Sequence, residues 1–378
     1  MGGEAPHPMA RTVVRFEQAG TGIMKTYKNL YPRICAFENL ERAFHQARRG
    51  KRRRRNVAGF ECNLELELIE LQDELLSESY RPGGYRHFTI YEGKPRRISA
   101  APFRDRVVHH ALCNVINPIW ERRFIHDSYA CRVGKGTHAA LDRTTYFARR
   151  YPYVLQADVV QFFPAVDHAI LRGLLARRIA DRPSMGLIDR ILASGTGIHA
   201  DSFEMQWFVG DDLLAANRPR GLPIGNQTSQ FWANVYLDPL DQFVKHELRC
   251  GKQSGAYLRY CDDLLLFAAD KPTLHRWRRE IEAFLVTLRL KIHAQKTAVY
   301  PVGNGIPFLG FLVFPDHRRL RQGNGHRFAR RLRWLVARYQ AGDIDFDQLT
   351  RSVQGWVAHA AHGDTWGLRR SLFNQVSL

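Results

Sequence analysis

Three aspartates stand where apolar strand patterns stop, a placement that could support metal-assisted chemistry. Asp158 ends the apolar run in VLQADVV, and the adjacent pair Asp262 and Asp263 interrupts the run in YLRYCDDLLLF. Burying unpaired carboxylates costs free energy, so these acids need cations, hydrogen bonds or solvent. Carboxylates bind Mg²⁺, and two such ions about 4 Å apart can stabilise both the attacking and the leaving oxygen of a phosphoryl transfer. The alternative is an ordinary β-turn, in which Asp is favoured.

The balance of charged residues indicates a polyanionic partner. The 378 residues include 56 Lys and Arg against 37 Asp and Glu, a formal net charge of +19. Basic side chains gain affinity for phosphates by releasing condensed counterions, so we expect contact with nucleic acid. The six cysteines are scattered without Cys-x-x-Cys spacing, which argues against a zinc site or a disulfide framework. No apolar run is long enough to cross a bilayer, so we expect no membrane partner.

Hydrophobic periodicity predicts the elements that must position the acids. Apolar runs predict strands over 85–91, 154–160, 257–266 and 308–313, with a hairpin around Asp262. Helical spacing predicts helices over 30–49, 107–124, 167–180, 229–248 and 274–288. A further helix has Leu64, Leu68, Leu71 and Leu75 on one face, whereas residues 93–106 combine turn chemistry with five basic side chains. Strands that alternate with helices indicate an α+β fold, a sheet backed by helices.

The C-terminal region is helical and basic. Residues 326–342 fit an amphipathic helix whose apolar face consists of Phe328, Leu332, Leu335, Val336 and Tyr339, with arginines over the remainder. Such a helix could pack on its neighbours and present arginines to a duplex backbone, or it could be a solvated basic face. We interpret the later His359, His362 and Asp364 as part of a capped helix pair with Trp356 and Trp366 in its core, not as a metal site.

Several segments in one chain order resemble the motifs of reverse transcriptases. Asp158 with the following Phe162 and Phe163 resembles motif A, and Tyr260-Cys261-Asp262-Asp263 resembles motif C. GLPIGNQTSQFWANVYLDPLD resembles motif B, LRLKIHAQKT motif D, and PFLGF the motif E primer grip. Upstream, GKPRRISAAPFRDR and SYACRVGKGTHAAL resemble the fingers motifs. The resemblance runs from about residue 25 to 370 and implies RNA-templated DNA synthesis.

The resemblance implies a role for each matched residue. Asp158, Asp262, Asp263 and the Val159 carbonyl would hold two Mg²⁺ ions, with Mn²⁺ as a substitute, and Lys296 would be the general acid. The dNTP would be bound by Lys94, Arg96, Phe162, Phe163, Ile224, Gly225 and Gln230, with Phe163 as the steric gate against a ribose 2′-hydroxyl. The primer grip would be Phe308, Leu309 and Gly310. The nucleic-acid backbone would meet Arg52, Arg53, Arg54, Arg104, Arg106, Arg327, Arg330 and Arg331.

Each of these residues also has a structural interpretation when it is taken alone. Phe163 could be a core residue, because Phe is often buried. Arg96 and Lys94 could be solvated surface charges, although a guanidinium fork suits a triphosphate. Lys296 could simply end a helix, where a cation interacts favourably with the helix dipole.

The family implies a right-hand polymerase fold of fingers, palm and thumb. We expect a loose N-terminal segment over 1–23, fingers over 24–152, palm over 153–315 with an insertion near 181–220, and thumb over 316–378. The chain ends near the thumb, so we expect neither an RNase H nor an HNH domain.

Motif B refines the resemblance. Its IGxxxSQ pattern, with Ile224 where most retroviral and intron-type enzymes have Gln, resembles the reverse transcriptases of diversity-generating retroelements. That family copies a template RNA with errors at adenines and uses a small, basic, oligomeric accessory protein. Ile224 offers no amide near the nascent base pair, so selectivity that depends on polar contacts should relax. Alternatively, Ile224 only packs against the template, and fidelity is decided elsewhere.

Two other functions stay open. One is a phage-defence or abortive-infection polymerase, which coding neighbourhood and template dependence would distinguish. The other is a catalytically silent RNA-binding scaffold, against which the retention of all three aspartates argues, because a scaffold needs no clustered acids. For the reverse transcriptase we expect template RNA, an RNA/cDNA duplex and dNTPs as partners, in a bacterial or phage-encoded protein of the cytoplasm, whereas the phage-defence polymerase could be protein-primed or template-independent.

Overall fold

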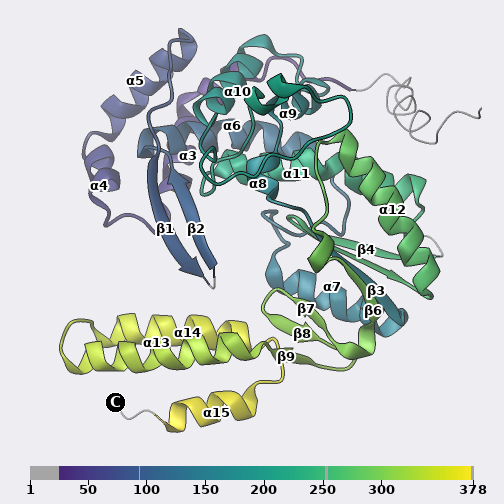
Figure 1. Ribbon diagram of the computed structural model, residues 1–378. Helices are drawn as coiled ribbons and strands as arrows, with labels where there is room; N and C mark the ends of the chain where they lie inside the picture. Colours follow the sequence, from purple (N-terminus) through teal and green to yellow (C-terminus); the bar gives the residue numbers. More distant parts are fainter. Residues whose placement is uncertain (1–24, 93, 252–253, 376–378) are drawn as a thin grey trace, which may run out of the picture. The chain divides into compact units, whose positions relative to one another are not determined.

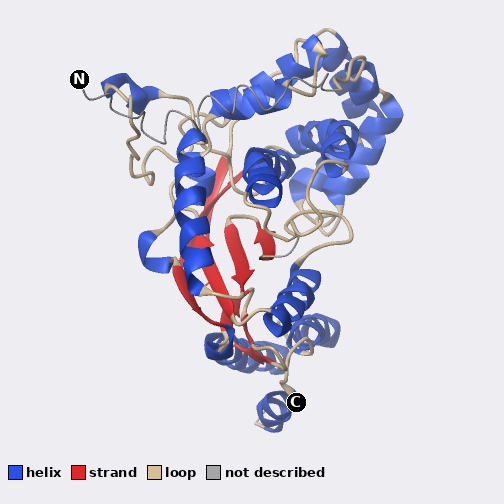
Figure 2. Cartoon of the chain, turned by 90° about the vertical axis from the view of Figure 1, so that its right-hand side faces the viewer, coloured by secondary structure: helices blue, strands red, loops and turns tan. Residues whose placement is uncertain are grey.

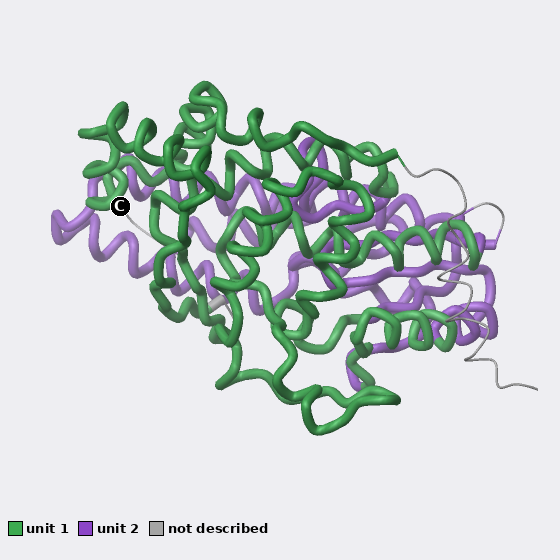
Figure 3. Tube along the Cα trace, turned by 90° about the horizontal axis from the view of Figure 1, so that it is seen from above, with its two compact units in different colours: residues 1–126, 158–248, 279–294 green, residues 127–157, 249–278, 295–378 purple. Residues whose placement is uncertain are grey.

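The computed structural model describes residues 25–92, 94–251 and 254–375, which form helices and antiparallel strand pairs (Figure 1). The predicted loose segment 1–23 lies outside these residues. Within the described part, no helix combines the length and apolarity needed to cross a membrane. The chain groups into two compact units, coloured separately in Figure 3. The first unit contains residues up to 126, 158–248 and 279–294, and the second contains 127–157, 249–278 and 295–378.

From residue 25 onward, the first unit begins with a group of short helices. These are α2 (Tyr31–Cys35), α3 (Phe37–Arg48), α4 (Arg55–Cys62) and α5 (Leu64–Leu76). The prediction of one helix over 30–49 is wrong at Ala36, whose ψ of 134° is extended. Side chains replace the helical hydrogen bonds there, because Asn39 donates to the Ile34 carbonyl and Gln72 to the Cys35 carbonyl. The predicted apolar face of α5 is confirmed, with Leu68, Leu71 and Leu75 buried.

A β-hairpin follows these helices. The predicted strand is β1 (Arg86–Glu92), which pairs with β2 (Lys94–Ala100) from Arg86↔Ala100 to Glu92↔Lys94. The turn expected over 93–106 is therefore wrong from residue 94 to 100. Strand β2 carries the exposed Arg96 and Arg97 on its two faces, so its sequence lacks the apolar alternation that marks a half-buried strand.

Helices and irregular segments make up the rest of the first unit, which also includes residues 279–287 of helix α12 (Lys271–Thr287). Its other helical elements are α6 (Phe103–Glu121), α8 (Phe162–Ala165), α9 (His168–Ala176), α10 (Arg182–Ser194) and α11 (Gln227–Gln242), with the 3-10 turn η1 (Leu213–Asn217) and the π-helical turn η2 (Phe243–Glu247). Helix α6 begins four residues before the predicted start at 107 and buries most of its length. The predicted helix over 229–248 corresponds to α11 together with η2.

The second unit contains a four-stranded sheet of order β4-β5-β3-β6 (red in Figure 2). Its strands are β3 (Tyr153–Asp158), β4 (Gly255–Tyr260), β5 (Asp263–Ala268) and β6 (Ala298–Pro301). The predicted hairpin is confirmed, because β4 and β5 are antiparallel from Gly255↔Ala268 to Tyr260↔Asp263. Strand β6 runs antiparallel to β3, and helix α7 (Thr137–Arg150) contributes to the same apolar core. Helix α12 (Lys271–Thr287) follows the hairpin.

The end of the chain forms a small sheet and three helices. Strands β7 (Ile306–Phe308), β8 (Phe311–Val313) and β9 (Arg318–Leu320) are antiparallel, and they precede α13 (Gln322–Gln340), α14 (Phe346–Ala360) and α15 (Trp366–Asn374). The predicted apolar face of α13 is confirmed, and Phe328 stacks on Trp356 with ring centroids 3.8 Å apart. The placement of Trp366 in this core is wrong: it is 65% exposed and lies under the Arg370 guanidinium.

We predict that Gly255→Ala destabilises the hairpin. A Cβ at this first residue of β4 would overlap the Phe267 carbonyl and lie 2.6 Å from Trp277 Cη2. Overpacking of this kind costs about 1–3 kcal/mol or more, so the free energy of unfolding, measured by urea titration, should fall by at least that amount. Gly303→Ala is the matched control, because a Cβ there meets no atom within 4 Å. Equal stability of the two variants would contradict the packing argument.

Candidate functional site

The adjacent acids lie at a tight turn in the second unit. Because Tyr260 pairs with Asp263, only Cys261 and Asp262 form the turn, and Cys261 has a φ of +56°. Asp262 and Asp263 are both half-buried. Burial and the neighbouring Asp262 carboxylate raise the pKa of the Cys261 thiol well above its usual value, so this cysteine is a neutral packing group.

The third predicted acid ends a neighbouring strand. Strand β3 runs to Asp158, where the chain passes into the first unit, and β3 lies next to β5, which begins at Asp263. Within the described ranges, no three His, Cys, Asp or Glu side chains gather closely enough to hold a metal ion by themselves. Mg²⁺, however, is usually held by one or two carboxylates with waters and substrate phosphates. The donor chemistry therefore fits a divalent ion that phosphate oxygens complete.

In the first unit, backbone pairing fixes the segment that follows β3. The His293 N–H donates to the Asp158 carbonyl (2.8 Å), the Val160 N–H donates to the Lys291 carbonyl (2.9 Å), and Val159 forms an antiparallel bridge with Ile292. The predicted Lys296 is exposed at the end of η3 (Ala294–Lys296), two residues before β6.

An ion cluster that the sequence did not reveal supports this pairing. The Arg289 guanidinium binds the Asp211 carboxylate and lies 3.8 Å from that of Asp167, while Arg218 also pairs with Asp211 at 3.1 Å. The hydrogen bond from Arg289 holds the pKa of Asp211 below its usual value. The Phe208 ring lies beneath both Arg289 and Lys291. No periodicity marks residues 195–220, so only the fold brings these charges together.

The structure brings several predicted dNTP-binding residues together within the first unit. The Ser99 N–H of β2 donates to the Ile224 carbonyl (2.9 Å), and the Leu222 N–H donates to the Phe163 carbonyl (2.8 Å). Gly225 has a φ of +117°, and a Cβ there would lie 3.0 Å from Ile98 Cγ2. Loop 221–226 is therefore held between β2 and the segment that carries Phe163.

The side chains around this loop differ in exposure. Arg96 is exposed and shares a face of β2 with Ile98, because side chains two residues apart point the same way. Phe163 is half-buried, whereas Phe162 is fully buried near Tyr236. Gln230 is exposed in the first turn of α11. The Lys94 side chain lies outside the described part of the structure.

The predicted primer grip forms the turn between β7 and β8 in the second unit. Leu309 and Gly310 both have positive φ (45° and 90°), and Phe308 is buried. The Phe308 ring meets the edge of the Tyr260 ring at 6.3 Å, directly before the acidic turn. The Asn324 side chain donates to the Gly310 carbonyl (3.0 Å) and so ties the turn to α13.

The predicted backbone-binding arginines fall into two groups. Arg53 and Arg54, together with Arg327, Arg330 and Arg331 of α13, are exposed. Arg327 also donates to the Asn324 side-chain oxygen, and the remaining three arginines, of which Arg52 is exposed as well, have partners within the protein. Arg52 pairs with Glu61 (3.3 Å), Arg104 with Glu74 (2.7 Å), and Arg106 donates to the Ala101 carbonyl (2.9 Å).

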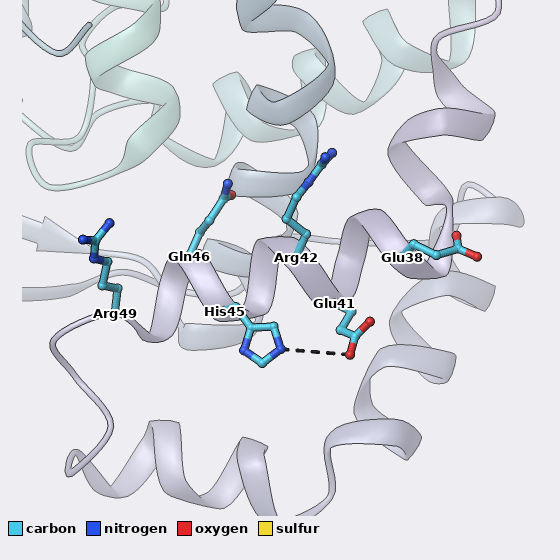
Figure 4. A pocket seen from close by; sticks show the side chains of 6 residues that line it. All are labelled: Glu38, Glu41, Arg42, His45, Gln46 and Arg49. Carbon is cyan, nitrogen blue, oxygen red and sulfur yellow. Dashed lines mark ion pairs between the residues drawn. The ribbon is translucent and has the colours of Figure 1, made fainter. Parts of the chain in front are cut away.

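Two further clusters contain titratable side chains. A shallow hollow along α3 is lined by Glu38, Glu41, Arg42, His45 and Gln46 of that helix and by Arg49, which directly follows it (Figure 4). In the second unit, His362 stacks on His138 with ring centroids 3.6 Å apart, and His359 lies beside them. An imidazole binds a metal ion through a nitrogen lone pair that lies in the plane of the ring. Two stacked rings are therefore poorly placed to share one ion. Burial and the neighbouring histidines lower the pKa of His138 and His359.

Residues 85–313 match the family model described as reverse transcriptase (RNA-dependent DNA polymerase). Protein YkfC of Escherichia coli is 29% identical over 71% of this chain and 74% of its own length. The group II intron-encoded protein LtrA of Lactococcus lactis is 25% identical over 48% of this chain, and nuclear intron maturase 1 of Arabidopsis thaliana is 33% identical over 27%. These matches span only 28% of LtrA and 15% of the maturase. The solved structure of apo telomerase from Candida tropicalis aligns with a TM-score of 0.43 at 11% identity, over 67% of this chain and 53% of that one.

The ion cluster generates a prediction on pH dependence. Because the folded pKa of Asp211 lies below its unfolded value, its ionised form stabilises the fold above the usual Asp pKa, and this stabilisation is lost as the pH falls through the folded pKa. Asp211→Asn should thus be less stable than the wild type at pH 7, and the difference should shrink below a pH of about 4. Urea titrations of both proteins between pH 7 and a pH below about 4 measure this difference in the free energy of unfolding. Asp189→Asn removes an exposed ion pair with Arg172 and should cost only about 0.5 kcal/mol. A difference between wild type and Asp211→Asn that does not change with pH would contradict the assignment.

Proposed function

The chain belongs to the reverse transcriptase family, and from this premise we propose that it copies a template RNA into cDNA at a centre formed by Asp158, Asp262 and Asp263. The observation that carries the proposal is the placement of these acids at neighbouring strands: Asp158 ends β3, Asp263 begins β5, and Asp262 lies in the turn directly before β5. Clustered carboxylates are costly to bury unless cations bind them. In a chain of net charge +19, bound metal ions would explain why these acids are placed together.

The acids and the Val159 carbonyl would hold two Mg²⁺ ions, with Mn²⁺ as a substitute; reverse transcriptases in general use divalent ions. Such ions would neutralise the charge that develops on the phosphate oxygens. The chain's own residues would position the primer 3′-hydroxyl for in-line attack on the α-phosphate of a dNTP. Lys296, exposed before β6, would donate a proton to the leaving pyrophosphate.

The nucleotide pocket would lie along loop 221–226 in the first unit. Arg96 would bind the triphosphate from the face of β2 that Ile98 shares, with help from Lys94. Phe163 would exclude a ribose 2′-hydroxyl, since it is half-buried and its carbonyl is tied to Leu222. Ile224 and Gly225 would face the nascent pair, and Phe162 and Gln230 would support the pocket. The hydrogen bond from Ser99 to Ile224 would link the triphosphate clamp to this loop.

The same proposal assigns residue ranges to the fingers, palm and thumb. Fingers would span 24–152, palm 153–315 with an insertion near 181–220, and thumb 316–378. The Phe308-Leu309-Gly310 turn would grip the primer. The exposed arginines of α13 (Arg327, Arg330 and Arg331) and the Arg53–Arg54 stretch would contact phosphates of the RNA/cDNA duplex.

We further propose that the enzyme belongs to a diversity-generating retroelement and errs at template adenines. Ile224 supports this, because its side chain offers no hydrogen bond beside the nascent pair and its carbonyl is occupied by Ser99. A small, basic, oligomeric accessory protein would then assemble with the polymerase and the template RNA. A phage-defence polymerase and a silent RNA-binding scaffold are the alternatives that the experiments below separate.

We predict that Asp262→Asn combined with Asp263→Asn abolishes primer extension. Loss of these charges should reduce the rate at least about 1000-fold on an RNA template with dNTPs and Mg²⁺, because they stabilise charge in the transition state. The assay is run with and without the accessory protein, and Asp189→Asn is the control acid outside the centre. Extension by the double variant would overturn the assignment of the centre. No extension by the wild type on any template would favour the scaffold.

We predict that Ile224→Gln lowers the error rate opposite template adenines. A side-chain amide could add one hydrogen bond near the pair, and about 1 kcal/mol corresponds to a roughly fivefold change in misincorporation. Sequencing of the cDNA products measures the error rate opposite adenines. Ile224→Val is the apolar control and should keep the wild-type error rate. Wild-type copying that is equally faithful at all four bases would reject the retroelement assignment and leave the polymerase intact.

A further inference from the structure

Arg259 in β4 is a buried charge directly beside the acidic turn. Its side chain is 0% exposed and is among the largest fully buried side chains of the protein. Taking a guanidinium out of water costs several kcal/mol unless it binds partners, and an apolar residue would suit this core position. The fold keeps the charge here, two residues before the turn begins, so its contacts need a specific explanation.

The guanidinium binds the turn itself. Arg259 Nη1 donates to the Cys261 carbonyl at 2.9 Å. This carbonyl and the amide nitrogen of Asp262 belong to the same planar peptide group, so the bond fixes the backbone orientation from which the Asp262 side chain departs. Arg259 is itself held through its backbone, because its N–H donates to the Asp127 carbonyl and its own carbonyl accepts from the Tyr129 N–H.

The turn needs such support because Cys261 is in a strained conformation. Its φ of +56° is at the first central position of a two-residue hairpin turn, where the type II′ turn prefers glycine. A residue with a Cβ keeps this conformation only when its surroundings over-determine it. The bond from Arg259 supplies that constraint from inside the core.

We propose that Arg259 is a positioning residue, which acts through the Cys261 carbonyl to hold Asp262 and Asp263 in the geometry that nucleotide addition requires. This inference rests on the proposed function, because it takes these two aspartates as the catalytic acids. Catalytic groups must be held within about 0.5 Å of their productive positions, and a turn that relaxes would exceed that.

The test compares Arg259→Met and Arg259→Lys in the full chain. Methionine keeps an unbranched chain but removes the donor, so the Cys261 carbonyl loses its partner; the melting temperature should fall only slightly and the chain should stay folded. On an RNA template, kcat should fall about 100-fold, the effect of a displacement near 1 Å, while the KM for dNTP and the Kd for an RNA/DNA duplex stay unchanged. Lysine restores a charged donor and should recover part of kcat. Arg149→Met is the control: it removes an exposed bond from Arg149 Nε to the Pro315 carbonyl (2.7 Å) and should behave as wild type.

Amide hydrogen exchange of a peptide covering 258–265 provides a readout independent of activity. Exchange at the turn should be faster in Arg259→Met than in the wild type. Wild-type kcat in Arg259→Met, or a joint loss of stability, duplex binding and kcat that lysine does not restore, would overturn the inference. If Arg259→Met does not fold, a lower kcat at unchanged KM in Arg259→Lys supports it and a wild-type kcat rejects it. If the wild type and Arg149→Met extend no primer, the proposed function fails, and the exchange rates alone decide whether Arg259 holds the turn.

Discussion

The register of the β4–β5 hairpin is the constraint on which the rest of the site depends. Pairing of Tyr260 with Asp263 leaves only Cys261 and Asp262 to reverse the chain, so the register decides which acid begins β5. Side chains alternate along a strand, and a slip of one residue would turn Asp263 to the opposite face of the sheet. Gly255 secures the far end by admitting Trp277 and the Phe267 carbonyl, and the hydroxyls of Tyr260 and Thr137, 3.1 Å apart, secure the end near the turn.

Asp158 is supported in a different way. It ends a strand, and the residues that follow leave the sheet and pair through their backbone with residues 291–293. That partner segment is short and would slide easily without an anchor. Arg289 provides one, because it binds Asp211 and approaches Asp167, the residue that caps α9. An irregular loop and an ion cluster therefore fix the position of Asp158, whereas regular strand pairing fixes the position of Asp263.

The sequence predicts those parts of the structure in which local pattern and tertiary environment agree. The hairpin around Asp262, the apolar faces of α5 and α13 and the strand ending at Asp158 follow from periodicity. The helix break at Ala36 could not be predicted, because the carbonyls before it are bound by the side chains of Asn39 and of Gln72, and Gln72 is 37 residues from its partner Cys35. Strand β2 carries exposed charges on a two-stranded ribbon, and the cluster of Asp211, Arg218 and Arg289 joins residues up to 78 positions apart. Neither leaves a periodic signal.

The basic residues on the surface and the buried Arg259 near the turn differ in what they can contribute to binding and alignment. A net charge of +19 attracts a polyanion to any exposed arginine, including those on α13, whose opposite face packs Phe328 against Trp356. Such binding is salt-dependent and carries no geometric precision. Precision must come from groups that cannot move, and in the second unit the structure offers a buried guanidinium in β4 that binds the strained turn. In the proposed polymerase, surface arginines would thus supply affinity, and the buried Arg259 would supply alignment.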